Sequence, residues 1–211
     1  MERLICLAAG YAFGLIQTGY IYGKIIHKDI RQYGSGNAGT TNALRVLGKK
    51  AGAVVFLGDF LKAVVLCLLV RFLYGKTQPE MAPLLMLYGG LGVVLGHNYP
   101  FYLNFKGGKG IAATSGVIIS MDWRITLVCL LAFIVSVAAT RIVSVGSLLV
   151  VSIFLAMWIG FGLFGLLPLT GAYLTESYIV VLVFAALAYW RHRANIKRLL
   201  NGTENKFGSK K

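Results

Sequence analysis

Acidic residues are scarce in this sequence, which has 7 Asp and Glu among 211 residues, against 21 Lys and Arg. The seven acids are spread over the chain and do not form the aspartate cluster with which a CDP-alcohol phosphotransferase would bind metal ions. The sequence also has no HExxH motif and no paired Cys and His cluster. We therefore expect neither a metal site nor a cofactor.

Signatures of covalent or nucleotide-dependent catalysis are absent as well. No Ser, Cys or Asp has an evident nucleophile setting, and no GK[ST] or GxGxxG motif occurs. No His is followed five residues later by Asp, as in the common HxxxxD acyltransferase motif. Cys6, Cys67 and Cys129 lie in apolar runs without CxxC spacing, which predicts buried free thiols. Any chemistry must then rest on positioning and charge, or on groups of the substrate.

Charged residues make up only 13% of the chain and hydrophobic residues 57%, whereas a soluble domain carries about 25% charged residues. The apolar runs are long and show no strand-like alternation, and about 20 apolar residues cross a bilayer as a helix. The sequence therefore predicts an all-α, polytopic membrane protein with a single domain over residues 1–211. Seven transmembrane helices are expected near 4–23, 51–74, 81–98, 110–121, 125–140, 145–167 and 172–190.

The distribution of basic residues predicts the orientation of these helices. With the N-terminus outside and seven spans, most Lys and Arg, including those of the tail at 191–211, face the cytoplasm. If the 110–121 stretch, about 18 Å long as a helix, were re-entrant instead, the basic tail would face outward. Because the basic residues are scattered between apolar segments, anionic lipid and phosphorylated small molecules are expected partners, and nucleic acid is not.

A donor-rich segment from Gly34 to Asn42 is the first candidate phosphate site. Its glycines let backbone N–H groups approach an anion closely. Thr41 or Asn42 is expected to cap a helix whose positive end favours phosphate, and Arg45 follows one turn later with a bidentate guanidinium. An interfacial helix near 41–50 and an ordinary polar loop are the alternatives for parts of this segment. The predicted binding residues are Ser35, Gly36, Asn37, Gly39, Thr40, Thr41, Asn42 and Arg45.

A second candidate site follows the third predicted span. Two adjacent glycines again permit close backbone approach, and the lysine after them supplies a point charge suited to phosphate. Gly110 then begins the short helix, which would place an anion at a helix N-terminus. A positive topology signal without any substrate is the alternative. The predicted residues are His97, Gly107, Gly108, Lys109, Gly110 and Thr114.

Two further candidate groups lie in the second half of the chain. Arg141 and Ser144 stand between two spans, where a topology signal with a capping serine is the alternative. His192 and Asn195 are three residues apart and share one face of a helix in the basic tail. The alternative for that tail is a juxtamembrane helix that rests on anionic lipid.

Asp59 and Lys62 are ionisable residues inside the second predicted span. Charged side chains at membrane depth are costly and face the bundle interior. A local ion pair and a role in holding a phosphate-binding cation both fit this spacing.

Together, these motifs resemble the bacterial acyl-phosphate:glycerol-3-phosphate acyltransferase family, and the resemblance covers nearly the whole chain. It rests on the segments 35–45, 96–114 and 192–199. One departure is Ala63, since the family usually has Gly after the lysine of the second span. The resemblance implies a plasma- or inner-membrane enzyme that transfers a fatty acyl group from acyl phosphate to glycerol 3-phosphate. The products would be 1-acyl-glycerol 3-phosphate (lysophosphatidate) and phosphate, in the first acylation of phospholipid synthesis.

The implied roles follow the motifs. Ser35, Asn37, Thr41, Arg45 and Lys109 would bind phosphate oxygens, and Lys109 or Arg45 would stabilise the leaving phosphate. His192 and Asn195 would orient the glycerol hydroxyl, whose proton goes either to the substrate's own phosphate or to His192. We expect these separate stretches to converge in one pocket at the inner leaflet. A soluble enzyme that supplies acyl phosphate is a further expected partner.

Two other functions share the basic cytoplasmic loops. An organic-phosphate transporter would have a midplane site with broken helices, often in paired repeats, and no repeat is visible. A non-catalytic scaffold for lipid-synthesis enzymes would not need several donor-rich glycine loops on one face.

Overall fold

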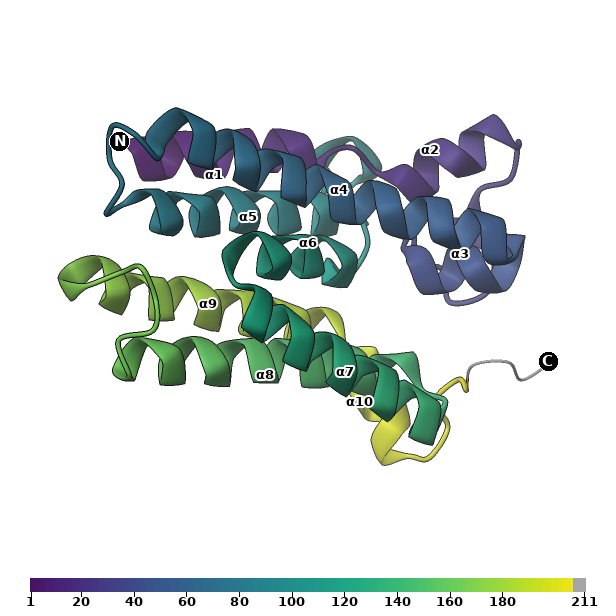
Figure 1. Ribbon diagram of the computed structural model, residues 1–211. Helices are drawn as coiled ribbons and strands as arrows, with labels where there is room; N and C mark the ends of the chain where they lie inside the picture. Colours follow the sequence, from purple (N-terminus) through teal and green to yellow (C-terminus); the bar gives the residue numbers. More distant parts are fainter. Residues whose placement is uncertain (207–211) are drawn as a thin grey trace. The chain divides into compact units, whose positions relative to one another are not determined.

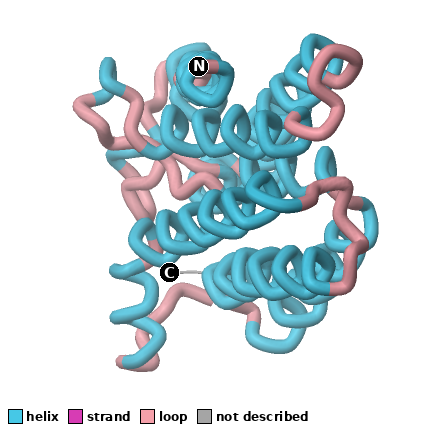
Figure 2. The backbone as a smooth tube through the Cα atoms, turned by 90° about the vertical axis from the view of Figure 1, so that its left-hand side faces the viewer, coloured by secondary structure: helices cyan, strands magenta, loops and turns pink. Residues whose placement is uncertain are grey.

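The computed structural model describes residues 1–206, which form helices joined by turns, with no strand in that range (Figure 2). The end of the predicted tail, residues 207–211, lies outside the described residues. The all-α prediction is confirmed. Within residues 1–206, five helical segments are long and apolar enough to cross a membrane, the first of which consists of two consecutive helices, and the seven-span topology stays a prediction. The five are Glu2–Ile25, Lys49–Tyr74, Trp123–Thr140, Val143–Leu163 and Gly171–Arg191.

The chain divides into two compact units, Met1–Met121 and Asp122–Lys211. In the first unit, α1, α4 and α5 run side by side, and α6 packs on α4 and α5 (Figure 1). The predicted short helix at 110–121 corresponds to α6. The elements of this unit are α1 (Glu2–Gly14), α2 (Thr18–Ile25), η1 (Ile30–Gln32), α3 (Thr40–Leu47), α4 (Lys49–Tyr74), α5 (Ala82–Asn98), η2 (Phe101–Leu103) and α6 (Ile111–Met121).

Glycines allow α1 and α5 to pack with their backbones in contact. Gly10 and Gly14 on α1 interleave with Gly92 and Gly96 on α5, so each helix presents a GxxxG pair to the other. A Cβ on Gly14 would lie 2.8 Å from the Cα of Gly96, and one on Gly92 would lie 2.9 Å from the Cα of Gly10. Small residues at such spacing are the usual means of close helix packing in membranes.

The first predicted span, near 4–23, is not one helix, because the chain breaks between α1 and α2. The carbonyl groups freed at the break accept hydrogen bonds from side chains. Lys62 Nζ donates to the oxygens of Gly14 (3.3 Å) and Ile16 (2.6 Å), and Tyr102 Oη donates to that of Leu15 (2.7 Å). A helix can end at membrane depth only if such partners exist. The predicted span corresponds to the candidate membrane span Glu2–Ile25, and only the break within it was not predicted from the sequence.

Gln17, which is buried in the break, ties it to the end of α5. Its Nε2 donates to the carbonyl oxygens of Gly14 (3.1 Å), Gly96 (3.2 Å) and His97 (3.1 Å). The break is therefore a fixed feature of the packing between α1, α2 and α5.

The second unit is built on α8, which packs against both α7 and α9. Its core contains the buried rings of Phe154, Trp158 and Phe184, with Phe154 edge-on to each of the other two. Trp158 Nε1 donates to Ser177 Oγ across the α8–α9 contact (2.9 Å). The helices are α7 (Trp123–Thr140), α8 (Val143–Leu163), α9 (Gly171–Arg191) and α10 (Arg193–Leu200).

We predict that Gly92→Ala lowers the thermal unfolding temperature in detergent. The new Cβ would overlap the carbonyl oxygen of Leu7 and lie 2.9 Å from the Cα of Gly10, so α1 and α5 must separate. Overpacking of this kind costs about 1–3 kcal/mol. Gly160→Ala in α8 is the control, since its Cβ meets no heavy atom within 4 Å and alanine is favoured within a helix. Equal unfolding temperatures for the two variants would contradict this packing.

Candidate functional site

The donor-rich segment ends in α3, which begins at Thr40 with Gly39 as its N-cap residue. Neither Thr41 nor Asn42 caps the helix, so that prediction was wrong. Instead, Asn37 Oδ1 accepts a hydrogen bond from the Gly39 N–H (2.9 Å), which fixes the turn just before the helix. The helix predicted near 41–50 corresponds to α3, which ends before Gly48, a residue with a positive φ of 87°, and its interfacial position stays a prediction.

Asn42 is buried and organises the loop that carries Ser35. Its Oδ1 accepts from the Ser35 N–H (2.9 Å), and its Nδ2 donates to the carbonyl oxygens of Ile30 (2.8 Å) and Tyr33 (3.1 Å). The amide is thereby engaged on both sides. Asn42 is therefore a positioning residue for Ser35, a role that the sequence did not indicate.

The outer surface of this segment offers several polar groups. Ser35, Gly36 and Arg45 are exposed, and Thr41 is half-buried. Thr40 Oγ1 is buried and has no hydrogen-bond partner within residues 1–206. A hydroxyl, a glycine backbone and a guanidinium thus lie on one short stretch, which suits a phosphate oxygen better than an apolar ligand.

The glycine loop packs against the end of α5. Gly107 N–H donates to the Asn98 carbonyl oxygen (3.1 Å), and Gly108 N–H donates to that of His97 (3.0 Å). A Cβ on Gly108 would overlap the imidazole of His97. The two glycines are thus required for packing, and their amides bond to α5. The half-buried Lys109 follows directly.

Gly110 separates this loop from α6 with a positive φ of 80°. The buried Thr114 lies in the first turn of α6, and its N–H donates to the Gly110 carbonyl oxygen (2.8 Å). Asn98, fully buried beside Gly110, has no partner for either amide atom within the described chain. Lys109 therefore stands at the N-terminus of a helix, as predicted, next to a buried amide that the sequence did not single out.

A buried charge network lies beneath the glycine loop. Lys62 Nζ lies 3.0 Å from Asp59 Oδ1 and 3.0 Å from His97 Nδ1, and Thr18 Oγ1 donates to Asp59 Oδ1 (3.1 Å). Each of the three ionisable residues is less than 7% exposed. The Asp59–Lys62 ion pair is confirmed, and it extends to His97 and through His97 to Gly108. Isolated charges within an apolar helix are energetically costly, so the Asp59–Lys62 pair in the sequence was a signal for a further polar partner such as His97.

The departure from the family pattern at Ala63 is accommodated by a glycine on the neighbouring helix. Ala63 is fully buried on the side of α4 that packs against α6. A Cβ on Gly116 of α6 would lie 3.0 Å from the Ala63 methyl. The extra methyl group therefore faces a position without a side chain.

In the second unit, Arg141 and Ser144 lie at the tight turn between α7 and α8. Arg141 is exposed and left-handed (φ 61°), and Thr140 Oγ1 accepts from the Ile142 N–H (3.1 Å). Ser144 is buried in the first turn of α8, and its Oγ has no hydrogen-bond partner within residues 1–206. The turn therefore presents a cation and a hydroxyl near a helix start.

His192 joins α9 to α10 and is buried. Its Nδ1 lies 2.8 Å from the Ala188 carbonyl oxygen. Because a carbonyl oxygen only accepts hydrogen bonds, Nδ1 carries the hydrogen, and Nε2 is the basic nitrogen of the neutral ring. This arrangement is the one that a proton acceptor acting through Nε2 requires.

Asn195 is buried on α10, and its Nδ2 donates to Glu204 Oε2 (3.2 Å). Arg198 Nε donates to the same oxygen (3.1 Å). Glu204 thus orients Asn195 from the segment after α10. Glu204 was not predicted from the sequence, although a single acid in a strongly basic tail was a usable signal. The convergence of the predicted residues of both units in one pocket stays a prediction.

Comparisons with known proteins give a consistent result. The family model for glycerol-3-phosphate acyltransferase matches residues 4–202. A glycerol-3-phosphate acyltransferase from Clostridioides difficile is 44% identical, over 99% of this chain and 97% of that protein. One from Thermoanaerobacter pseudethanolicus is 41% identical, over 100% and 98%. Crystal structures of PlsY (YgiH), an integral membrane glycerol 3-phosphate acyltransferase, share 33% identity over 99% of this chain and 96% of that chain. Their TM-scores are 0.83 for the glycerol 3-phosphate form and 0.81 for the lysphosphatidic acid form.

We predict that Asn42→Ala loosens the loop that presents Ser35. The change removes three hydrogen bonds, each worth about 0.5–1.5 kcal/mol, while the Ile30 and Tyr33 carbonyl oxygens keep the N–H groups of Tyr33 and Gly36. Hydrogen exchange over residues 30–36 should therefore speed up, while exchange in α8 stays as in the wild type. Asn201→Ala, on an exposed residue after α10, is the control. Unchanged exchange at 30–36 in Asn42→Ala would disprove the positioning role.

Proposed function

Because the chain belongs to the glycerol-3-phosphate acyltransferase family, we propose that it transfers a fatty acyl group from an acyl phosphate to the sn-1 hydroxyl of glycerol 3-phosphate. The products are 1-acyl-glycerol 3-phosphate and inorganic phosphate. The observation that carries the proposal is the likeness, along 99% of the chain, to an acyltransferase solved in glycerol 3-phosphate and lysphosphatidic acid forms.

An acyl phosphate is the donor that suits the side chains of this protein. It is a mixed anhydride and reacts with a hydroxyl without a prior acyl-enzyme. The three cysteines are buried free thiols, and within residues 1–206 neither Ser35 nor Ser144 makes a hydrogen bond to a histidine. Direct transfer therefore asks the protein for positioning and charge stabilisation. A soluble enzyme that makes acyl phosphate would be the upstream partner.

Most of the groups assigned to the phosphates of both substrates belong to the first unit. Ser35 and Arg45 are exposed on a loop and helix fixed by Asn42, and they bind phosphate oxygens together with Asn37 and Thr41. Lys109 stands at the start of α6, where the helix dipole adds to its charge. We assign to Lys109 and Arg45 the stabilisation of the charge that develops on the leaving phosphate.

The hydroxyl group is assigned to the second unit. His192 Nε2 accepts the hydroxyl proton while the substrate oxygen attacks the carbonyl carbon of the acyl phosphate. The bond from that carbon to the phosphate oxygen then breaks, and the departing phosphate takes up the proton from His192. Asn195, oriented by Glu204, holds the glycerol hydroxyl, and Arg141 and Ser144 contribute to phosphate binding.

We also propose that the protein crosses the bacterial plasma membrane seven times, with the N-terminus outside and α10 in the cytoplasm. The support is the excess of Lys and Arg on that side. A cysteine in place of the exposed Lys197 should react with a membrane-impermeant maleimide in inverted vesicles and not in intact cells. The opposite labelling pattern would reverse the proposed topology.

We predict that Arg45→Ala and Lys109→Ala each lose nearly all acyl transfer. Each variant loses a cation whose interaction with the substrate is stronger in the transition state than in the ground state. The loss of such a group lowers kcat by about 100-fold to 1,000-fold. The assay is phosphate release by purified protein with acyl phosphate and glycerol 3-phosphate, with acyl-CoA and acyl carrier protein as competing donors. Lys76→Ala, on an exposed turn after α4, is the control. Full rates in both Arg45→Ala and Lys109→Ala would place the site elsewhere.

We predict that His192→Ala lowers the rate by roughly 100-fold or more, since a general base contributes about that much. Near-normal activity in His192→Ala would exclude the histidine as base and transfer the role to the substrate's own phosphate.

A further inference from the structure

An exposed aromatic segment joins α5 to the glycine loop. We call residues 99–106 the aromatic loop, which contains η2. Phe101, Tyr102 and Phe105 in this loop are 57%, 43% and 59% exposed. The rings of Phe101 and Tyr102 are in edge-on contact, with their centres 5.8 Å apart, and Lys106 at the end of the loop is exposed as well. Large exposed rings that gather on one short loop mark an interaction surface.

The backbone of the aromatic loop is bonded within the protein. Every N–H group from Leu103 to Gly108 donates to a backbone oxygen of residues 97–103, at 3.0–3.1 Å. A loop surrounded by water can leave such groups to the solvent, whereas each unbonded group is costly at membrane depth. The loop therefore meets the condition for a non-helical segment that lies where water is scarce.

Two consecutive residues of the aromatic loop take the left-handed conformation, Asn104 with φ 53° and Phe105 with φ 58°. Asparagine tolerates this conformation, but for phenylalanine it costs about 1–2 kcal/mol, whereas glycine takes it freely. The turn lets the Phe105 N–H reach the Pro100 oxygen (3.0 Å) while the ring stays exposed. A strained, exposed phenylalanine at a position suited to glycine points to a role for its ring in an interaction.

The length of α5 sets the depth of the aromatic loop. α5 has 17 residues and is therefore about 25 Å long, whereas the hydrocarbon core of a bilayer is about 30 Å thick. α5 begins two residues after the exposed and charged Glu80, so its first end is at the membrane surface and the shortfall is at its other end. Tyr102 fits this depth, since its hydroxyl donates to the Leu15 oxygen inside the candidate span Glu2–Ile25 (2.7 Å). The loop therefore begins at the boundary between acyl chains and headgroups.

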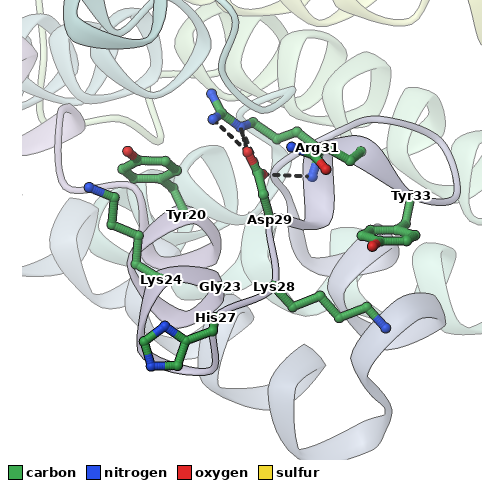
Figure 3. A pocket seen from close by; sticks show the side chains of 9 residues that line it. Tyr20, Gly23, Lys24, His27, Lys28, Asp29, Arg31 and Tyr33 are labelled. Atoms are coloured by element: carbon green, nitrogen blue, oxygen red, sulfur yellow. Dashed lines mark hydrogen bonds and ion pairs between the residues drawn. The ribbon is translucent and has the colours of Figure 1, made fainter.

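Tyr20 connects the aromatic loop to the basic end of α2. The rings of Tyr20 and Tyr102 lie 6.1 Å apart. Arg31 Cζ and Lys24 Nζ lie 4.8 Å and 5.2 Å from the centre of the Tyr20 ring. Figure 3 shows Tyr20 and Lys24 together on one side of an open pocket of about 640 Å³ at the end of α2. Aromatic rings flanked by Lys and Arg are typical of a membrane–water interface.

We propose that the aromatic loop is inserted into the membrane interface, with the Phe101 and Phe105 side chains among the lipid acyl chains and the Lys106 ammonium at the headgroups. The partner is the lipid of the surrounding bilayer. Lipid fits better than a soluble protein, because the N–H groups of residues 103–108 are already bonded and offer nothing to a partner's backbone. The insertion does not depend on the proposed reaction. Because Lys109 follows the loop directly, the insertion also holds the glycine loop at headgroup depth.

The test is spin-label EPR of the full chain in liposomes of phosphatidylglycerol and phosphatidylcholine. A nitroxide is attached to Phe101→Cys or to Phe105→Cys, and its collision rates with oxygen and with a water-soluble nickel chelate are measured. The native cysteines are buried, and wild-type protein treated with the label gives the background. Apolar side chains of interfacial segments lie about 5–10 Å into the boundary between headgroups and acyl chains, so both labels should report a depth in this range.

Two reference positions calibrate the measurement. Thr77→Cys, on the exposed turn after α4, is the reference for water, and Val135→Cys, at a position of α7 that is 64% exposed, is the reference for lipid. Labels at 101 and 105 should collide with oxygen as the label at 135 does, and several-fold less often with nickel than the label at 77. Phe101→Cys alone decides if position 105 does not tolerate cysteine, because Phe101 has no positive φ.

Two outcomes would overturn the proposal. Equal nickel collision rates for the labels at 101 and 77 would place the aromatic loop in water. Low collision rates with both oxygen and nickel at 101 would mean that a protein surface, and not lipid, covers the rings.

Discussion

The first unit depends on the hydrogen bonds and the ion pair that the ammonium group of Lys62 makes. It donates to two carbonyl oxygens at the break between α1 and α2, pairs with Asp59 and lies 3.0 Å from His97. In a membrane, a broken helix is tolerated only where neighbouring groups bond to the freed carbonyls. Lys62 supplies those bonds from α4 and has its own charge balanced by Asp59. The same group thus bends the first span and reaches, through His97, the glycine loop before Lys109.

In the proposed site, the residues that bind the anions differ from the residues that hold them in position. Asn42, His97 and Glu204 are each bonded to the residues they support, which are Ser35, Gly108 and Asn195. The groups assigned to substrate are hydroxyls, side-chain amides, two guanidinium groups, an ammonium and an imidazole. Such a set suits transfer from an already activated donor, where orientation and charge stabilisation supply most of the rate. It also explains why no nucleophile motif occurs in the sequence.

Much of this architecture could be predicted from the sequence. Hydrophobic length located α7, α8, α9 and the short α6, and charge in an apolar run indicated the Asp59–Lys62 pair. The break after Gly14 could not be found in this way, because its carbonyls are bonded by Lys62 and Tyr102, which lie 48 and 87 residues away from their acceptors. The roles of Asn42 and Glu204 were hidden for a related reason. Their side chains bond to neighbouring loops, and neither periodicity nor composition reports where a side-chain amide or carboxylate points.

The most direct test of the central claim is the free energy of unfolding of Lys62→Met, Asp59→Asn and the double variant in detergent. Breaking a buried ion pair by removing one partner costs about 3–5 kcal/mol, because the other charge is left uncompensated. We therefore predict a loss of that size for Lys62→Met and a partial recovery in the double variant. Wild-type stability in Lys62→Met, or a double variant that loses the full sum of both single losses, would contradict the account.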